Sequence, residues 1–241
     1  MNRQTYKAKL LTPLFYSSAE GQEIKASKIL SSTALTHALG YKYGELEKRY
    51  VETGEEATNP DYSHLNDLDM FISDMSPVRD TVEVSEKTFR SVDHRSERNF
   101  TTNDRGVAQK VYDERKDKSY SHSIPEVLSG GAAWQTQRRY VGIKPGAEFT
   151  FTVWSKEKLP SELNFRMGIG RTGEIKAEEI PDKDSVILNL FLLKNTFKLD
   201  EEEIQEAVTK ETSFERGNDP RLQHLKGISL ENAEKLIKKV L

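Results

Sequence analysis

The sequence of 241 residues has no cysteine, no long apolar run and little net charge. Without cysteine it can form neither disulfides nor thiolate metal sites, which is typical of proteins in a reducing compartment. No window approaches the roughly 18 apolar residues that cross a bilayer. The first residues, 1–6, lack the apolar core of a secretory signal. We therefore expect a cytoplasmic protein that does not enter a membrane.

The net charge of -3, from 36 basic and 39 acidic side chains, excludes a polycation of the histone type. Binding of nucleic acid would need a local basic patch instead. Residues 138–176 contain eight basic and four acidic side chains, whereas residues 177–241 contain ten basic and fourteen acidic ones. The middle of the chain is therefore basic, and the C-terminal quarter offsets it.

Residues 165–173, Phe-Arg-Met-Gly-Ile-Gly-Arg-Thr-Gly, combine three glycines with two arginines directly after segments that resemble strands. Glycine lets backbone N–H groups approach an anion, and a guanidinium can fork onto two phosphate oxygens. An ordinary glycine-rich turn between strands explains the same residues equally well. This glycine loop is a candidate site for a phosphate backbone.

Polar and apolar residues alternate over residues 5–11 and predict a first strand, and an apolar stripe over residues 25–39 predicts a helix that Gly40 ends. Residues 41–131 are polar, with only short apolar islands. A structureless loop of this length is improbable in a compact domain, so we expect an inserted subdomain of irregular hairpins. Its basic residues are interleaved with nearly as many acids, which is typical of a solvated surface.

Ordered structure is predicted again after residue 131. Residues 134–143 and 148–155 alternate and predict a hairpin around the Lys-Pro-Gly-Ala turn at 144–147. Residues 163–167 predict a further strand that leads into the glycine loop. The apolar run at 186–193 predicts a strand that is buried on both faces.

The last segment, residues 196–241, predicts a helical extension. Asp200 can cap a helix over 201–209, with Glu203 completing a capping box, and Ser229 can cap a second helix that runs to the end of the sequence. Residues 225–237 also resemble the second half of a helix-hairpin-helix, a module that grips a DNA backbone. A simple capped helix is the alternative interpretation of that segment.

A series of landmarks then resembles a known family, the Csc-one proteins. These are the Cas-five-type subunits of type I-D CRISPR effector (Cascade) complexes, within the RAMP superfamily. The resemblance covers roughly residues 5–195 and depends on the order and spacing of the landmarks. They are Glu20-Gly21, Ala34-Leu35, Ala38-Leu39-Gly40, Met75 to Arg79, Thr88-Phe89, Ser123-Ile124-Pro125, Arg139-Tyr140-Val141, Pro145-Gly146, Phe149-Thr150-Phe151 and Phe165 to Gly168.

The resemblance implies an α+β fold with a ferredoxin-like (RRM-related) core of residues 1–40 and 132–195. Residues 41–131 would be an inserted thumb, and residues 196–241 lie outside the resemblance as the C-terminal extension. The implied role is non-catalytic, without metal or cofactor: the subunit would cradle the 5′ handle of the CRISPR RNA in an antiviral ribonucleoprotein complex. Its partners would be a Cas-seven-type backbone subunit and a Cas-ten-like large subunit that reads target DNA near the protospacer-adjacent motif.

The residues expected to bind RNA belong to the glycine loop and to the neighbouring strands. Guanidinium groups would contact phosphates, and the glycines would allow close approach of the backbone. These residues are Arg138, Arg139, Arg166, Gly168, Gly170, Arg171, Gly173 and Lys176.

An enzyme is the competing class, since some Cas-five proteins of another subtype are metal-independent endoribonucleases that use tyrosine, lysine and histidine. Lys118, Tyr120 and His122 bring those residue types onto one face of a strand, as almost any polar strand would. His37 is the other candidate, although a histidine packed between helix and sheet explains it as well. The remaining histidines, His64, His94 and His224, show no metal-ligand spacing. A protein-interaction module without nucleic acid is the third possibility.

Overall fold

The computed structural model describes residues 1–16, 23–25, 27–44, 46, 62–90, 137–168, 171–216 and 222–241. The chain divides into two compact units. The larger one consists of Met1–Ala19, Ala26–Ser85 and Gly142–Leu241, and the smaller one of Glu20–Lys25 and Glu86–Val141. Among the helices of the described residues, none is long and apolar enough to cross a bilayer.

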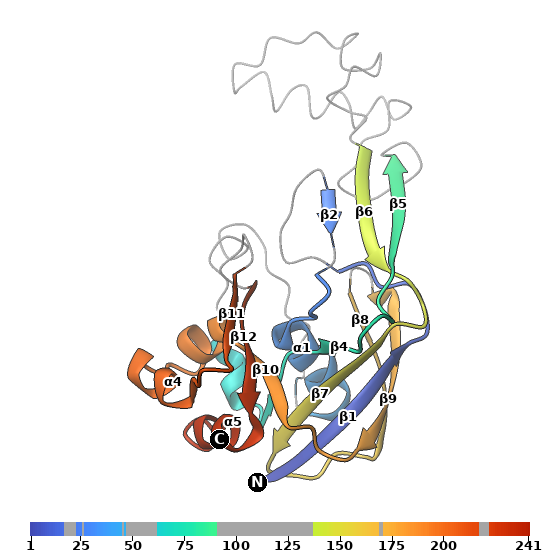
Figure 1. The fold of residues 1–241 in the computed structure, drawn as a ribbon. Coiled ribbons are helices and arrows are strands. Elements are labelled where there is room, and N and C mark those ends of the chain that lie inside the picture. Colours follow the sequence, from blue (N-terminus) through green and yellow to red (C-terminus); the bar gives the residue numbers. More distant parts are fainter. Residues whose placement is uncertain are drawn as a thin grey trace, which may run out of the picture. The chain divides into compact units, whose positions relative to one another are not determined.

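A curled antiparallel sheet forms the centre of the larger unit (Figure 1). Its strands follow the order β3-β7-β1-β9-β8, and β4 also pairs with β7. All pairings between described residues in this sheet are antiparallel. The strands are β1 (Asn2–Leu10), β3 (Met70–Ile72), β4 (Ser76–Pro77), β7 (Glu148–Ser155), β8 (Glu162–Met167) and β9 (Gly173–Ile180).

The strand pairings differ from the expected ferredoxin-like core. In a βαββαβ arrangement the two central strands run parallel, because a helix crosses over between them. Here the central strand β1 is antiparallel to both of its neighbours, β7 and β9. The mixed α and β composition is therefore as predicted, but the described pairings of this sheet do not reproduce the ferredoxin-like order.

Alternating burial explains why these segments form strands. In β1, Tyr6, Ala8 and Leu10 are buried while Lys7 and Lys9 are exposed. The pattern repeats in β8, where every second residue is buried. Because side chains alternate between the two faces of a strand, β1 and β8 each place apolar residues on one face and polar or charged ones on the other, whereas β7 is buried on both faces. The predicted strands over residues 5–11, 148–155 and 163–167 are confirmed.

Helix α1 (Ser32–Tyr43) covers the apolar face with Leu35 and Leu39. Full burial of such a side chain stabilises the fold by about 1.5–3 kcal/mol. The helix does not end at Gly40, as the sequence suggested, but continues to Tyr43. Gly40 serves packing instead, because a Cβ there would lie 2.6 Å from Leu46 Cδ1.

The turn at residues 144–147 connects β6 (Gln137–Ile143) to β7, but the two strands do not form the expected hairpin. Both edges of β7 are occupied, by β1 on one side and by β3 and β4 on the other. Strand β6 belongs to a separate sheet of order β2-β6-β5, with β2 (Glu23–Lys25) and β5 (Val84–Arg90).

The expected thumb boundaries shift in the structure. Residues 62–85 lie in the larger unit, because β3 and β4 pair with β7 of the curled sheet. The 3-10 helix η2 (Ser63–Asp67) precedes them and buries Leu65 in the same core. The smaller unit contains residues 86–131 of the expected thumb together with residues 20–25 and 132–141, which were expected in the core.

A second sheet, of order β10-β12-β11, lies in the C-terminal part of the larger unit. It consists of β10 (Ser185–Asn189), β11 (Ser213–Arg216) and β12 (Gln223–Ser229). Helix α5 (Leu230–Ile237) packs against β10 and β12, and α4 (Glu201–Ala207) packs against α5. The residues after 195 are thus part of a layered α and β structure rather than a helical extension.

Both helix caps predicted for the tail are confirmed, but the helix-hairpin-helix interpretation is wrong. Asp200 and Glu203 form a full capping box at α4, and the Ser229 side chain accepts a hydrogen bond from the Asn232 N–H at α5. Between these helices the chain forms β11 and β12. Leu225 and Ile228 are fully buried and hold β12 as a strand in the second core.

The two sheets of the larger unit share this second core. Phe71 and Trp154 point from β3 and β7 into the same apolar cluster as Leu188, Leu225 and Leu236. A boundary at residue 195 would cut this cluster in two. The strand predicted over 186–193 ends earlier, at Asn189. The Asn189 side-chain oxygen accepts a hydrogen bond from the Leu192 N–H, where the π-helix η4 (Leu192–Thr196) begins.

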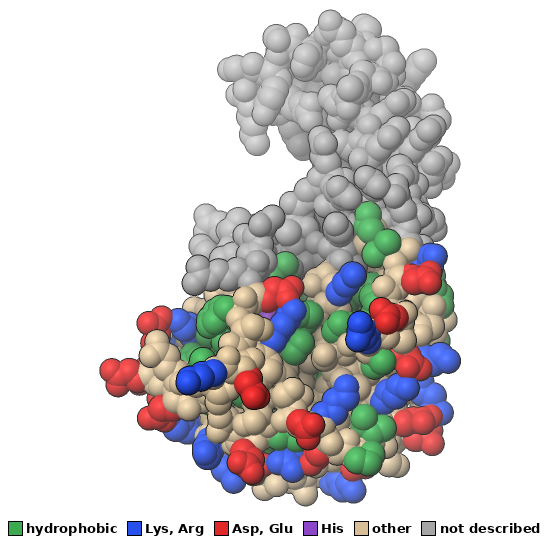
Figure 2. Space-filling view, viewed as in Figure 1, with side chains coloured by type: hydrophobic (Ala, Val, Ile, Leu, Met, Phe, Trp, Pro, Cys, Tyr) green, Lys and Arg blue, Asp and Glu red, His purple; other side chains and the backbone are tan. Residues whose placement is uncertain are grey.

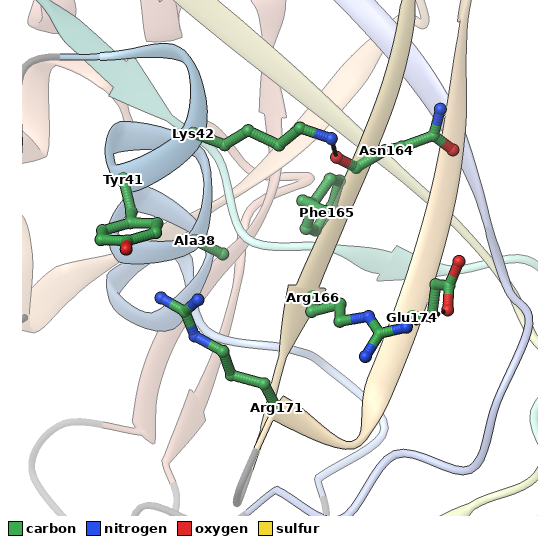
Figure 3. A pocket seen from close by; sticks show the side chains of 8 residues that line it. All are labelled: Ala38, Tyr41, Lys42, Asn164, Phe165, Arg166, Arg171 and Glu174. Carbon is green, nitrogen blue, oxygen red and sulfur yellow. Dashed lines mark hydrogen bonds and ion pairs between the residues drawn. The ribbon is translucent and has the colours of Figure 1, made fainter.

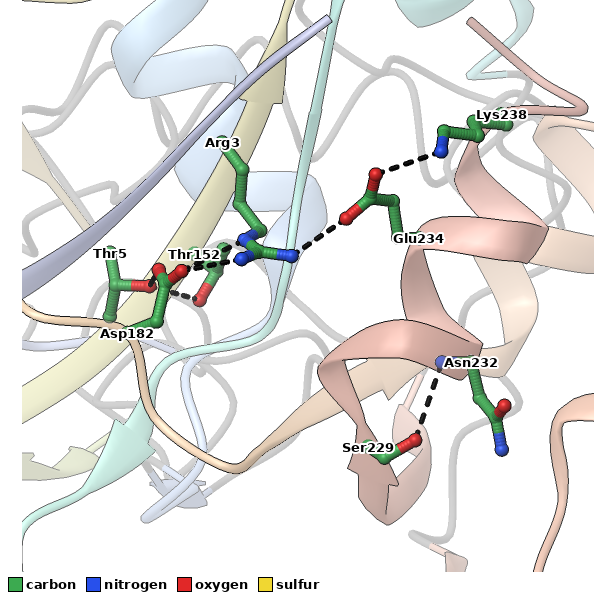
Figure 4. A network of polar contacts seen from close by, with 8 residues as sticks. All are labelled: Arg3, Thr5, Thr152, Asp182, Ser229, Asn232, Glu234 and Lys238. Atoms are coloured by element: carbon green, nitrogen blue, oxygen red, sulfur yellow. Dashed lines mark hydrogen bonds and ion pairs between the residues drawn. The ribbon is translucent and has the colours of Figure 1, made fainter.

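Polar contacts also tie the C-terminal part to the first sheet. Arg3 on β1 donates to Asp182 at 2.6 Å and to Glu234 on α5 at 2.7 Å (Figure 4). In the interior, the Asp74 carboxylate accepts a hydrogen bond from the Ser32 N–H and pairs with His224 Nδ1 at 2.7 Å. Since His224 lies on β12, this buried pair joins the second sheet to the start of α1.

Candidate nucleic-acid interface

A pocket of about 430 Å³ lies between the last turn of α1 and the end of the hairpin formed by β8 and β9 (Figure 3). Three of its side chains are cationic and one is a carboxylate, which gives a net formal charge of +2. Over the described surface in Figure 2, by contrast, acidic and basic side chains are interspersed. The lining residues are Ala38, Tyr41, Lys42, Asn164, Phe165, Arg166, Arg171 and Glu174.

The pocket exists because β8 is the edge strand of the curled sheet and α1 covers that edge. An edge strand has backbone groups without a neighbouring strand. At Asn164 these groups bond to the helix instead: the Lys42 ammonium donates to the Asn164 carbonyl, and the Tyr43 hydroxyl accepts from the Asn164 N–H at 2.9 Å. These contacts fix the end of α1 beside the hairpin.

Arg171 approaches the helix from the hairpin loop. Its backbone is left-handed, with φ 54°, and its N–H donates to the Gly168 carbonyl at 3.0 Å. Its guanidinium carbon lies 4.3 Å from the centre of the Tyr41 ring, within the range of a cation–π contact. In the described part of the chain, no carboxylate forms an ion pair with Arg171. Its charge is therefore available to an anion.

Arg166 lies on β8 opposite Glu174 on β9 and pairs with it at 2.8 Å. The two side chains are 62% and 39% exposed, so water competes with the pair. Pairs of this kind contribute about 0–1 kcal/mol, which a phosphate can match. The pair is at the surface and beside the other cations of the pocket.

The loop glycines that the structure describes serve packing on the segment after β1. Gly168 has φ +88°, and a Cβ there would lie 2.5 Å from Leu14 Cδ1 and 2.7 Å from the Phe15 carbonyl oxygen. At Gly173 a Cβ would also lie 2.5 Å from Leu14 Cδ1. Packing alone therefore explains why these two positions are glycine. The expectation that they are glycine to let a phosphate approach the backbone loses this part of its support. Gly170 lies outside the described residues.

Lys176 does not line the pocket. It lies on the solvent side of β9 and pairs with Glu178 at 3.0 Å and with Glu162 at 3.4 Å. Hydrogen bonds to these carboxylates, first to Glu178, raise the pKa of Lys176 above its ordinary value. Lys176 therefore lies outside this pocket, between two carboxylates.

The family of this chain follows from its similarity to known proteins. The profile of the family described as "Type I-D CRISPR-associated protein Cas5/Csc1" matches residues 1–213. The chain belongs to the type I-D Cas5/Csc1 family. No curated protein matches the chain. Among solved structures, one chain of the "Cryo-EM structure of the Type III-B Cmr-beta bound to cognate target RNA and AMPPnP, state 1" is 12% identical, with a TM-score of 0.38, and the match covers 94% of this chain and 84% of that one.

Several expected residues of this Cas5/Csc1 family member are not placed in the pocket. Arg138 and Arg139 lie in the part of β6 of which only the backbone is described, with Arg139 in register with Glu23 of β2. The alternative catalytic set of Lys118, Tyr120 and His122 lies outside the described residues, as does His94. Among the residues that are described, no group of three or more metal-ligating side chains occurs.

The described histidines of this Cas5/Csc1 chain are held by internal contacts. His37 donates from Nδ1 to the Thr33 carbonyl at 2.7 Å, and its Nε2 lies 3.0 Å from His64 Nε2. Burial lowers the pKa of His37, the bond to Thr33 raises it, and His64 lowers it again, so that the neutral form is favoured. His224 is buried against Asp74.

Sequence reasoning did not find Tyr41 and Lys42, which supply an aromatic ring and a third cation to the pocket. The signal was present as the run Tyr41-Lys42-Tyr43, where aromatic and basic residues adjoin. The sequence pattern places this run in the polar insertion, because Gly40 predicts the end of the helix. Since α1 continues to Tyr43, the run forms the last turn of the helix instead.

Proposed function

We propose that this chain is a non-catalytic subunit of a type I-D CRISPR surveillance complex and binds the 5′ handle of the CRISPR RNA. The observation that carries the proposal is the net positive pocket at the α1–β8 edge, in a chain whose family assembles with CRISPR RNA-guided complexes. Arg166 and Arg171 contact phosphates, and Lys42 adds a third positive charge. Target sequence is selected by base pairing with the guide, while the protein contacts backbone and shape.

A single-stranded handle fits this pocket better than a duplex does. Proteins that bind single strands combine cations along the backbone with aromatic rings for the bases. The pocket has both, because Tyr41 and Arg171 form a cation–π pair beside Lys42 and Arg166. Guanidinium groups suit this role, since each can form two parallel hydrogen bonds with phosphate oxygens.

We infer further that the subunit caps the complex at one end, in the cytoplasm. Its partners are a Cas-seven-type backbone subunit and a Cas-ten-like large subunit next to the protospacer-adjacent motif of the target DNA. The smaller unit consists of two segments inserted into the larger one in sequence, which supports a role as the thumb.

The test uses the complex reconstituted with its guide RNA, in which the double variant Arg166→Ala/Arg171→Ala replaces the wild-type subunit. We expect weaker retention of the handle. The slope of log affinity against log salt concentration should also become shallower, by about 0.7 for each lost phosphate contact with a single strand, or about 1.4 for two. The matched control is Lys158→Ala/Lys176→Ala. It removes the same charge, but from side chains paired with Glu179, Glu162 and Glu178.

Equal effects of the two double variants would show that only overall charge matters, and the pocket would then lose its role. Absence of any effect would remove the glycine loop from the RNA site. A second measurement addresses catalysis: wild-type complex incubated with repeat RNA in the absence of metal should leave the RNA intact. Site-specific cleavage that disappears in His122→Ala would contradict the non-catalytic role.

A further inference from the structure

We propose that the pocket between α1 and the β8–β9 hairpin takes one unstacked nucleotide of the bound RNA, with its base on the pair of Tyr41 and Arg171. The proposal deepens the function above and rests on it, because it names the part of the RNA that enters the pocket. It also names Tyr41 as a binding residue, which charge alone would not indicate.

The size of the pocket argues for more than a phosphate contact. A cavity of about 430 Å³ falls within the range of roughly 300–1,000 Å³ of small-ligand sites. Phosphates on a strand that runs over a flat surface need no such depression. The volume suits a unit with a ring and a phosphate, which is what one nucleotide presents when it leaves its neighbours.

The lining of the pocket places a flat surface next to unneutralised charge. Tyr41 is 47% exposed, although most large apolar side chains in the described residues are buried. The Arg171 guanidinium carbon lies 4.3 Å from the centre of the Tyr41 ring, so the two groups adjoin and are here called the platform. RNA-binding proteins stack unpaired bases on aromatic rings and on guanidinium planes. This platform therefore has the surface that a nucleobase requires.

The backbone of Arg171 supports the same conclusion. Arg171 has a left-handed backbone, which costs a residue with a side chain free energy that it would not cost glycine. The loop already contains glycines, so an arginine at this position stands out. Residues held in such conformations gather at binding sites, where the surrounding structure maintains them. Here the bond from the Arg171 N–H to the Gly168 carbonyl maintains the turn that directs the guanidinium to Tyr41.

The charges distinguish a nucleotide from an apolar occupant. The Lys42 ammonium donates a hydrogen bond to the Asn164 carbonyl, and the Arg171 guanidinium makes a cation–π contact with Tyr41. Neither charge is neutralised by a carboxylate of the described residues. Arg166 shares its charge with Glu174 in an exposed pair. A phosphate beside the platform would complement these groups, whereas a purely apolar side chain would leave them without an anion.

The experiment uses the reconstituted complex and a set of guide RNAs in which each handle nucleotide in turn lacks its base. For the wild-type subunit, we expect one abasic position to weaken RNA retention by about 5- to 150-fold, the range for loss of one stacked base. In Tyr41→Leu, the intact guide should bind with a similar loss, and the abasic substitution should then have no further effect. Tyr41→Phe should retain wild-type behaviour, because the ring is preserved.

Two controls protect this interpretation. Phe214→Leu changes an exposed aromatic residue on β11, away from the pocket, and should leave retention unchanged at every position. Thermal unfolding of Tyr41→Leu alone tests whether the variant folds as the wild type does. A 2-aminopurine base at the sensitive position should be quenched in the wild-type complex and brighter in Tyr41→Leu, which reports stacking independently of affinity.

The outcomes separate this proposal from the proposed function. Dependence on Arg166 and Arg171 without any abasic position coupled to Tyr41 would overturn the nucleotide site and leave handle binding intact. If the RNA depends on neither arginine, both proposals fail. If Tyr41→Leu lowers incorporation of the subunit into the complex while the handle contacts persist, the pocket belongs to a protein partner and the nucleotide site is overturned.

Discussion

The two ends of the β8–β9 hairpin carry opposite charge balances. At the loop end, Arg166 and Arg171 meet one carboxylate, Glu174, and α1 adds Lys42. Further along the same strands, Lys176 is held between Glu162 and Glu178. The number of basic residues in the hairpin therefore says little about where an anion can bind. What matters is which cations already have a carboxylate neighbour.

Reversal of charge should show the largest difference between the two ends of the hairpin. We expect Arg166→Glu/Arg171→Glu to lower retention of guide RNA in the reconstituted complex by about 100-fold or more, since like charges placed against each other cost several kcal/mol. Lys158→Glu/Lys176→Glu changes the net charge equally but should lower RNA retention much less, because neither residue lines the pocket. Filter binding at a fixed salt concentration measures both, and equal losses would contradict the distinction between the two ends.

The loop end also depends on close packing at Gly168. Gly168→Ala should lower the free energy of unfolding by about 2–4 kcal/mol, because a left-handed backbone and a collision with Leu14 act together. Gly146→Ala is the matched control, since its φ is +91° but a Cβ there meets nothing within 4 Å. It should cost about 1 kcal/mol. Urea unfolding compares the two, and a similar cost at both sites would refute the packing explanation.

Arg171 offers a way to separate stability from binding at the same position. Arg171→Gly should raise the free energy of unfolding by about 0.5–1 kcal/mol or leave it unchanged, because glycine adopts φ 54° without steric cost. RNA retention should fall as far as it does in Arg171→Ala. A loss of stability in Arg171→Gly would mean that the contact of the guanidinium with Tyr41 contributes more to folding than the left-handed backbone costs.

The helix that supplies Lys42 should respond to mild acid through His37. Burial lowers the pKa of His37, so the folded state binds its proton less readily than the unfolded state does. The resulting stability is complete above pH 6.5, the ordinary value, and is lost as the pH falls below it. We expect urea unfolding to show a larger loss between pH 7.5 and 5.5 in the wild type than in His37→Gln. Identical losses would contradict the assignment to His37.

Local features of the fold could be predicted with good accuracy. Residues 148–155 form a strand with the predicted bounds, and Asp200 and Ser229 cap helices as expected. These features depend on short-range physics, namely side-chain alternation and the bonding of free N–H groups at a helix start. Pairing could not be predicted in the same way. Nothing near residues 137–143 in the sequence indicates that both edges of β7 are already occupied.

For the candidate site, the sequence indicated the strand before the glycine loop and the arginines, but neither β9 nor their surroundings. Lys176 is expected among the RNA-binding residues because it is basic. Only the register of β8 and β9 shows that it lies between Glu162 and Glu178, outside the pocket. Tyr41 was missed because its partner, Arg171, is 130 residues away in the chain and reaches it only across the edge of the sheet. Such contacts depend on long-range packing, which residue spacing does not encode.

The sequence by itself determined the family, the strand before the glycine loop and the presence of arginines in that segment, because landmarks and alternation are written in consecutive residues. Only the tertiary structure decided that α1 extends over the sheet edge and completes a pocket, and that the loop glycines pack against Leu14. The physical reason is that free charge and accessible aromatic surface are properties of neighbours in space. A guanidinium that faces a ring and one that faces a carboxylate are the same letter in the sequence.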